Sequence, residues 1–448
     1  MHWIALQPRP EALADASTNA QALPADLPTA LAWWALQFTP LVAWVDASLV
    51  LEVSASERLF GGRTALLQGL FAAQPVALQQ AQGATALLAL GRLWSAQPEA
   101  PIDTLPLHSL AAARAHLSTL QRLGCATWGQ LRALPRAGLA RRFGAALLEA
   151  LDRAYGLRPE RYPWLRLPDV FAQSLELAAA VEAAPALLFA ARRLLAQLLL
   201  WLRARQQGVL ALELQWQLDA RRSNASHVDA HHHGDGRGQL VLRTAQPTQD
   251  MAHVQRLLGE LLAQVQLPAP VLYLRLRSLQ TQALAGESHS LLPDDQRKGG
   301  SLHQMQERLA ARLGGGQVLC VQPQALHNPQ HMQRWLPWAP GPASRPAGAA
   351  MLEAQQAVLL PSWLLSEPQP LQTQHDCPQY HGPLTLLAGP QRLESGWLDE
   401  AASLRDYYVA RSAHAGLLWI YRERLPGTGQ KKTSTAPGRC WFLHGLFA

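Results

Sequence analysis

Cysteine and lysine are both rare in this chain of 448 residues. The cysteines are far apart and lack the paired spacing of metal ligands, which predicts free thiols in a reducing cytoplasm. Four are present: Cys125, Cys320, Cys377 and Cys440. Lysine occurs three times among 39 lysines and arginines, so arginine, which suits bidentate phosphate contacts, carries most of the positive charge. The net charge of +7 favours a polyanionic partner, although a codon bias toward arginine produces the same balance.

The sequence also shows no signal-peptide pattern and no convincing membrane span. The most apolar expected helix, at residues 184–202, carries Arg192 and Arg193, which makes a membrane crossing unfavourable. Hydrophobic residues make up 48% of the chain, enough for a large core, and the length allows roughly two to four domains. We therefore expect a cytoplasmic protein of several domains without membrane attachment.

The most informative stretch is a predicted β-hairpin between Leu41 and Ser54. Residues 41–45 form an apolar run, and Asp46, Ala47 and Ser48 form the turn. Residues 49–54 then alternate between apolar and polar faces, which is typical of a strand.

This hairpin resembles the palm hairpin of Y-family (UmuC/DinB-like) DNA polymerases, and more closely that of ImuB-type proteins of bacterial inducible mutagenesis. Active members carry an Asp-Glu pair, two residues, Leu-Asp, a β-branched residue and Ser. Aligning residues 51–54 on that ending puts Ala47 and Ser48 where the catalytic pair stands. A one-residue bulge would restore Asp46 as the Asp, but Ala47 would still replace the Glu. The expected opening strand, residues 2–6, lacks the first Asp of active members.

The missing acids matter because nucleotidyl transfer uses two metal ions, and magnesium needs carboxylate oxygens. At most one of three carboxylates remains, so we expect no catalytic residue, no metal and no cofactor. Asp46, Ala47 and Ser48 are then degenerate active-site positions. The resemblance also implies fingers after the first strand, but only the short piece 7–28 stands there.

The resemblance implies a multidomain α+β fold of the Y-family polymerase type. It divides the chain into a reduced palm without fingers (1–103), a helix-hairpin-helix thumb (104–170), a little finger (171–285), a linker and irregular region (286–375) and a small β-rich C-terminal interaction module (376–448). The strings in this last part, such as 405–410 and 417–424, are close to the C-terminal pattern of ImuB-type proteins. Asp406 and Tyr407 lie in a strand-like run there, so we expect them to be structural.

The thumb is predicted from a run of short helices. One helix ends at Leu123 with Gly124 at its stop, Thr127 caps the next, and a third breaks at Gly144. The backbone N–H groups of the Gly124 hairpin can hold a DNA phosphate, helped by a helix N-terminus. Five arginines surround these turns: Arg122, Arg132, Arg136, Arg141 and Arg142. A three-helix packing unit with a solvated arginine face is the alternative interpretation.

The little finger is predicted from two helices, 182–205 and 248–265, and three strands, 210–218, 239–243 and 271–276. Two strand–helix–strand arms on one sheet fit this order. Five arginines are expected to contact phosphates and to position the protein without reading sequence: Arg221, Arg222, Arg243, Arg275 and Arg277. The three histidines at 231–233 lie in a polar loop, and consecutive residues do not readily share one metal ion.

A sliding-clamp peptide is implied by the resemblance after the little finger. Ser290, Leu291 and Leu292 form an apolar island in the linker, but no Gln precedes the leucines, so a leucine pair covering a domain edge fits equally well. The last residues, 440–448, are expected to form a closing β-strand.

Three functions remain open from the sequence. The first, implied by the resemblance, is a catalytically inactive adaptor in DNA repair and SOS mutagenesis. It would bind primer-template or damaged DNA and link the sliding clamp, a RecA-like ImuA-type protein and an error-prone polymerase III alpha-type subunit. The alternatives are an active translesion polymerase with a relocated acid, and a protein scaffold without DNA affinity.

Overall fold

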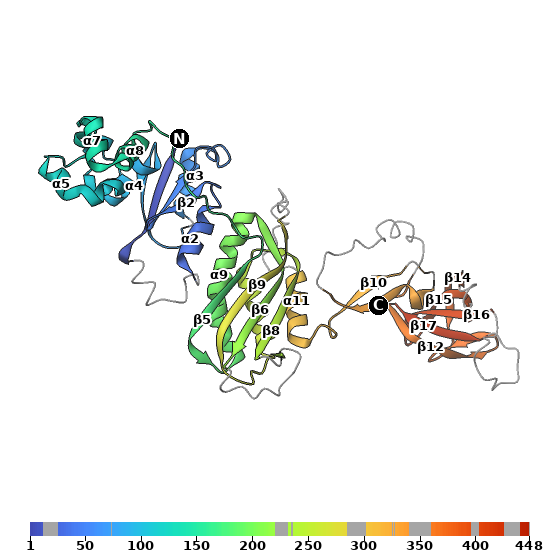
Figure 1. Ribbon diagram of the computed structural model, residues 1–448. Helices are drawn as coiled ribbons and strands as arrows, with labels where there is room; N and C mark the ends of the chain where they lie inside the picture. The colour runs from blue at the N-terminus through green and yellow to red at the C-terminus, as the bar shows by residue number, and fades with distance from the viewer. Residues whose placement is uncertain are drawn as a thin grey trace. The chain divides into compact units, whose positions relative to one another are not determined.

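The computed structural model, drawn in Figure 1, describes residues 1–11, 26–72, 74–219, 232–233, 236–284, 302–324, 326, 328–339, 360–395, 403–424 and 440–447. The chain divides into two compact units, Met1–Arg312 and Leu313–Ala448. The α+β class with a β-rich C-terminal module is confirmed. The finer division into five parts stays a prediction.

The palm-like part is a four-stranded antiparallel sheet in the order β2-β3-β1-β4. Its strands are β1 (Trp3–Pro8), β2 (Val42–Val45), β3 (Ser48–Glu52) and β4 (Leu78–Gly83), and its helices are α2 (Leu27–Ala35), α3 (Arg63–Ala72) and α4 (Ala86–Trp94). The apolar face predicted for β3 is confirmed, since Leu49 and Leu51 pack with α2 and α3, but the face expected to be polar is buried as well, with Val50 packed against α4. Both faces of the strand are therefore buried.

The thumb-like part consists of short helices around a core of its own. They are η1 (Ile102–Thr104), η2 (Leu107–Ser109), η3 (Ala111–His116), α5 (Leu117–Arg122), α6 (Trp128–Ala133), α7 (Arg136–Phe143) and α8 (Ala145–Ala154). The predicted helix ends are confirmed. Gly124 and Gly144 have φ of 79° and 87°, which glycine adopts without the strain of a side chain. Thr127 accepts a hydrogen bond from the Gln130 amide in a capping box.

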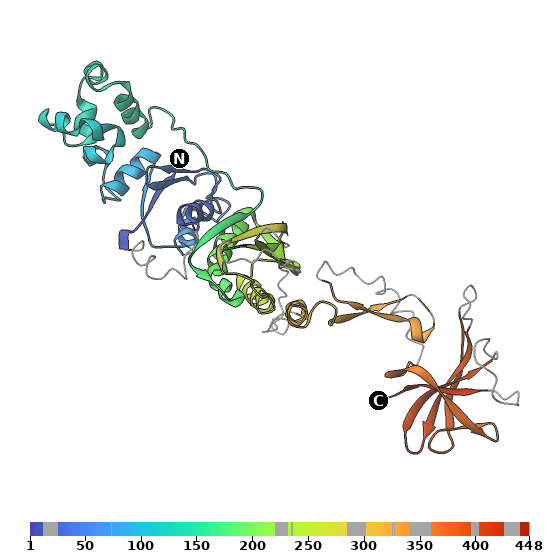
Figure 2. The same cartoon turned by 60° about the horizontal axis from the view of Figure 1, so that its bottom comes forward.

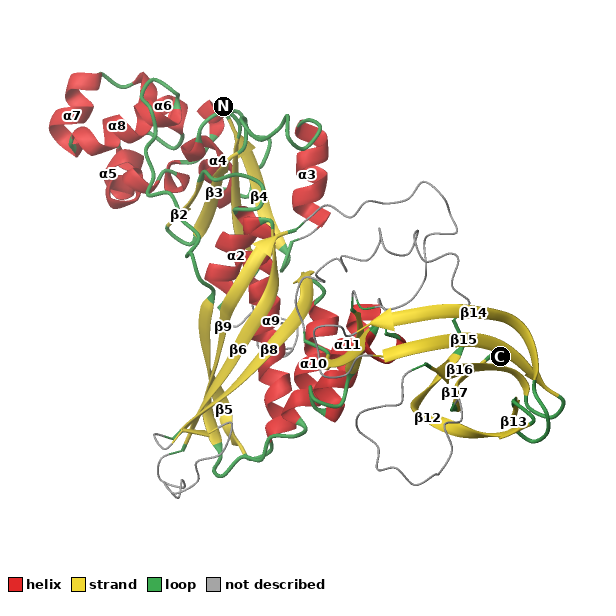
Figure 3. Cartoon of the chain, turned by 90° about the vertical axis from the view of Figure 1, so that its right-hand side faces the viewer, coloured by secondary structure: helices red, strands yellow, loops and turns green. Residues whose placement is uncertain are grey.

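The little-finger-like part is a five-stranded antiparallel sheet in the order β5-β9-β6-β8-β7. Its elements are β5 (Ala172–Val181), η4 (Ala184–Ala186), α9 (Leu187–Arg205), β6 (Gln207–Leu218), β7 (His232–His233), β8 (Arg237–Thr248), α10 (Met251–Leu262) and β9 (Val271–Ala283). Two strand–helix–strand arms are present, β5-α9-β6 and β8-α10-β9, although the opening strand of the first arm was not among the predicted strands. Helices α9 and α10 cover one face of the sheet and leave the other face open (Figure 3).

The apolar helix α9 is buried for a reason that composition does not reveal. It packs on the sheet with one side and on α2 with another, so its core is continuous with that of the palm-like part. Phe171 joins the two by ring contacts at 5.8 Å to Trp33 and 6.0 Å to Trp201. The segment Ala184–Arg205 is long and apolar enough to cross a membrane, but 56% of its apolar window is buried inside the fold. A helix with apolar residues on two of its sides fits such a sandwiched position.

Helix α11 (Leu302–Leu313) follows the little-finger-like part. The second unit then contains a two-stranded ribbon of β10 (Leu319–Pro323) and β11 (Gln333–Pro337), with η6 (Pro329–His331) between them. A curved six-stranded antiparallel sheet, seen in Figure 2, has the order β13-β12-β17-β16-β15-β14. Its strands are β12 (Trp363–Gln374), β13 (Cys377–Gln379), β14 (Thr385–Ser395), β15 (Ser403–Ser412), β16 (Gly416–Glu423) and β17 (Trp441–Leu446).

The C-terminal sheet supports two predictions. Strand β17 is the expected closing strand, and it pairs with β12 on one side and β16 on the other. Asp406 is only 2% exposed and lies 3.2 Å from Arg392 and 3.3 Å from Arg422, so it has structural partners. Tyr407 stacks on Trp419 at 4.0 Å and bonds to His444 at 2.9 Å, and burial lowers the pKa of His444 to about 4.

Strands β5, β7, β11, β12 and β13 were not expected from the sequence, and β7 takes His232 and His233 out of the polar loop expected there. Strand β5 is rich in alanine, which lowers its strand propensity, and β12 and β13 contain proline and glutamine. Helix α9 also begins at Leu187 rather than at Glu182, because Pro185 lies in the preceding turn η4. Tertiary pairing overrides local preference at these places.

Candidate functional site: the palm tip and two arginine groups

The palm tip is the two-residue turn Asp46-Ala47 together with Ser48. Val45 pairs with Ser48 and Trp44 with Leu49, so the register is regular and no bulge shifts Asp46. Asp46 has φ of 51°, a left-handed conformation that aspartate tolerates in tight turns. Leu6 of β1 lies opposite Leu49, so the carboxyl end of β1 reaches the same edge of the sheet. That end carries Gln7 and Pro8, and neither supplies a carboxylate.

Two side chains from distant parts of the sequence occupy the palm tip. The Trp94 indole N–H donates to the Ser48 hydroxyl at 2.9 Å, and Ser48 is fully buried. Arg114 from η3 places its guanidinium 3.2 Å from an Asp46 carboxylate oxygen and 4.4 Å from the centre of a Trp94 ring. The tip therefore holds one carboxylate, and the guanidinium of Arg114 lies beside it.

Two nearby acids, Glu52 at the end of β3 and Glu57 in the following turn, contact His2. Glu52 is buried and accepts from the His2 amide at 3.3 Å, and Glu57 lies 2.7 Å from the His2 ring. Glu52 pairs with Trp3, whereas Leu49 beside the palm tip pairs with Leu6. Glu52 therefore lies three residues along the strand from Leu49, away from the palm tip. Among the described residues, no group of three or more His, Cys, Asp or Glu side chains is arranged to hold a metal ion.

The thumb hairpin at Gly124 has no spare backbone donors. The amides of Leu123, Gly124 and Cys125 donate to helix carbonyls within 3.2 Å. The Gln130 carboxamide oxygen accepts from the amides of Ala126 and Thr127 at 2.7 and 3.2 Å. A phosphate would have to displace these acceptors, which weakens the predicted role of this hairpin. Gln130 follows Thr127 by three residues, which is the spacing of a capping box, so the sequence already contained the pattern for this cap.

Several thumb arginines contact neighbours within the fold. Arg136 forms two hydrogen bonds to Asp152, at 2.9 and 2.8 Å, and these hold the pKa of Asp152 below its usual value. Arg132 lies 4.1 Å from the Tyr155 ring, and the Arg122 guanidinium bonds to the Ser118 carbonyl. Arg136 is thereby tied to the packing of α7 on α8.

Arg141 and Arg142 contact neighbours in their own helix: the Arg141 guanidinium bonds to the Ala137 carbonyl at 3.3 Å, and Arg142 lies 5.9 Å from the neighbouring Phe143 ring. Both are exposed in the last turn of α7, directly before Gly144 and the start of α8. Helix α8 has no side-chain cap, and its first residues, Ala145 and Ala146, are exposed. The first amides of a helix lack intrahelical acceptors and carry a partial positive charge. This second turn combines two features that favour a phosphate.

The open face of the little-finger-like sheet brings the predicted arginines together. Arg275 and Arg277 of β9 and Arg243 of β8 are exposed at alternate positions, so they project from the side opposite α9 and α10. None of the three forms an ion pair with the acids of the described chain. Arg221 and Arg222 lie outside the described residues, as do Ser290, Leu291 and Leu292.

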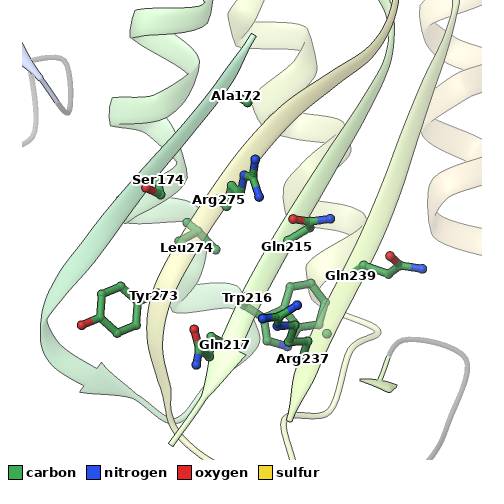
Figure 4. A pocket seen from close by; sticks show the side chains of 11 residues that line it. Ala172, Ser174, Gln215, Trp216, Gln217, Arg237, Gln239, Tyr273, Leu274 and Arg275 are labelled. Carbon is green, nitrogen blue, oxygen red and sulfur yellow. The ribbon is translucent and has the colours of Figure 1, made fainter. Parts of the chain in front are cut away.

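The same face has a shallow hollow of about 560 Å³ (Figure 4). Strand register places Ser174, Arg275, Gln215 and Gln239 in one row across four strands. Arg237 and Tyr273 lie in the next row, on either side of Gln217. The sequence does not reveal these polar neighbours, because their grouping depends on strand β5 and on the cross-strand register.

Comparisons with known proteins agree with the resemblance. The chain is 28% identical to Protein ImuB of Caulobacter vibrioides strain NA1000 / CB15N, over 93% of this chain and 92% of that protein, and the same figures hold for strain CB 15. None of the family models searched matches the chain. Among solved structures, a Dbh ternary complex (TM-score 0.28, 11% identity) and DinB from Sulfolobus solfataricus (TM-score 0.27, 12% identity) each align over 62% of this chain and 98% of their own. The likeness to ImuB, predicted from the residues, is confirmed.

Proposed function

We propose that this chain is a non-catalytic, Y-family polymerase-like adaptor in DNA-damage-induced translesion synthesis. The observation that carries the proposal is the shortage of carboxylates at the palm tip. Two divalent cations need several carboxylate oxygens around them, and the tip offers Asp46 alone. Arg114 supplies a permanent positive charge beside that carboxylate, which opposes the arrival of a metal ion.

The first experiment is primer extension with Mg²⁺ or Mn²⁺. We expect no template-dependent incorporation by the full chain, nor by an Arg114→Ala variant, because removing the guanidinium leaves only one carboxylate. Incorporation that disappears in an Asp46→Ala variant would instead establish an active polymerase.

DNA binding is the second part of the proposal. It is supported by arginines on the open little-finger face, Arg243, Arg275 and Arg277, and by the α7–α8 turn with Arg141 and Arg142. We propose the same role for Arg221 and Arg222, and a weaker one for Arg122, Gly124, Arg132 and Arg136, which contact their own fold. Phosphate contacts of this kind do not read sequence.

Binding to a primer-template duplex across a series of salt concentrations tests this part. The logarithm of the affinity should fall by roughly 0.9 per contacted phosphate for each tenfold increase in salt. An affinity that does not respond to salt would favour a scaffold that binds no DNA.

The linking role rests on the likeness to ImuB and is the third part. We propose the sliding clamp, an error-prone polymerase III alpha-type subunit and a RecA-like ImuA-type protein as partners, with Ser290, Leu291 and Leu292 as the clamp peptide. Pull-downs with deletions of 286–300 and of 376–448 separate the possibilities. Loss of clamp binding in the first deletion alone assigns the peptide, and unchanged binding in both contradicts the assignment.

A further inference from the structure

Helix α11 is attached to the little-finger-like part through polar groups. Its Glu307 carboxylate is 6% exposed, accepts from the Ala245 amide at 2.6 Å and forms a short bond to the buried His253 ring. The Gln264 side chain donates to the carbonyls of Ala311 and Arg312 at 2.6 and 3.1 Å. These contacts define which side of α11 faces the fold.

The opposite side of α11 is apolar and exposed. Leu302, Met305 and Leu309 are 66%, 58% and 37% exposed, at a spacing of three and four residues. At 100° per residue they fall on one stripe, directly across the helix from Glu307 and Ala311. A surface helix ordinarily buries its apolar stripe, so this reversed orientation marks a surface that another element covers.

Positive charge borders this apolar stripe along one edge only. Arg308 and Arg312, one turn apart, both border the stripe on the Met305 side and are exposed. The other border carries Gln306 and Ala310, which are uncharged. No carboxylate of the described chain forms an ion pair with either arginine. The stripe and its basic border together have the pattern of one half of a helix–helix interface.

We propose that the outer side of α11 binds an amphipathic helix of a partner protein, one whose apolar stripe is bordered by acidic residues along one edge. The apolar side chains supply the contact area, and the arginines set the orientation and select acidic over basic partners. The inference goes beyond the proposed function, because it depends neither on DNA binding nor on the state of the palm tip.

The test uses the full chain and two labelled synthetic helical peptides with identical leucine stripes, one edged with Glu and one with Lys. Fluorescence anisotropy should show the Glu-edged peptide binding about tenfold or more tighter than the Lys-edged peptide. Arg308→Glu with Arg312→Glu should reverse this preference. Met305→Glu and Leu309→Glu should each abolish binding, whereas Leu59→Glu, which changes an 84% exposed leucine elsewhere, should change nothing.

Several outcomes would overturn the proposal. Equal binding of both peptides would refute the role of the arginines, and binding of neither would refute the surface. Self-association that disappears in Leu309→Glu, measured by sedimentation equilibrium, would assign the stripe to a second copy of the chain. Because the altered side chains are exposed, thermal unfolding of each variant should match that of the original protein. If Leu309→Glu is less stable than the original protein, Met305→Glu tests the same surface.

Discussion

The thumb and the little finger both contain clusters of arginine, but the two clusters differ in what the arginines contact. Arg136 of the thumb is bonded twice to the buried Asp152, and Arg132 lies over Tyr155. Arg275 and Arg277 of the little finger project from an open sheet face and pair with no carboxylate of the described chain. Local charge density therefore does not reveal whether an arginine is available to a phosphate, because the tertiary neighbours of each arginine determine its availability.

The largest expected effect comes from the little-finger face. Replacing Arg243, Arg275 and Arg277 by Ala should lower the slope of log affinity against log salt by roughly 0.9 for each lost contact, and reduce DNA affinity by about tenfold or more. The matched control removes the same charge from the helical side of the same part, with Arg192, Arg203 and Arg256 replaced by Ala. Equal losses in both triple variants would mean that net charge, rather than this face, attracts DNA.

A smaller loss is expected at the second thumb turn. Arg141→Ala with Arg142→Ala should weaken binding to any DNA sequence. The slope of log affinity against log salt should fall by up to the contribution of about two phosphate contacts. Both arginines are exposed, so thermal stability should stay unchanged. Filter binding or anisotropy across a salt series measures the slope. An unchanged slope would remove the α7–α8 turn from the proposed interface.

Arg136 sharpens the contrast inside the thumb. Arg136→Ala removes the bidentate partner of the buried Asp152 and leaves it the longer contact to Arg158 at 3.8 Å, and a poorly paired buried charge destabilises a fold. Its midpoint of thermal unfolding should fall by a few degrees, while DNA affinity changes less than in the Arg141 and Arg142 variant. The reverse ranking, with stability intact and binding lost, would return Arg136 to the DNA interface.

The smallest expected effect is a pH dependence of thumb stability. Arg136 lowers the pKa of Asp152 from its usual 3.8, so the folded state binds that proton less readily than the unfolded state. The stabilisation is therefore present above about pH 4 and is lost as the pH falls through the lowered pKa. The difference in unfolding free energy between the original protein and Asp152→Asn should shrink from about pH 5 to about pH 3. A constant difference would show that the ion pair contributes no stability.

The sequence alone determined the elements whose local pattern and tertiary environment agree. The β2–β3 hairpin, the glycine breaks at Gly124 and Gly144, and the strand–helix–strand arm of β8, α10 and β9 follow from alternation, caps and helix period, and all were predicted. The absence of acids from residues 2–6 and from Ala47 and Ser48 also needs no coordinates.

Only the tertiary structure decided how the palm tip is filled and which arginines are engaged. Arg114 meets Asp46 across 68 residues and Trp94 meets Ser48 across 46, so no local window contains either pair. Likewise, strand β5 exists because β9 offers it a pairing edge, and the outward apolar stripe of α11 depends on Glu307 being bound by His253 and Ala245. Periodicity shows that a helix or strand has two faces, but long-range packing chooses which face is buried.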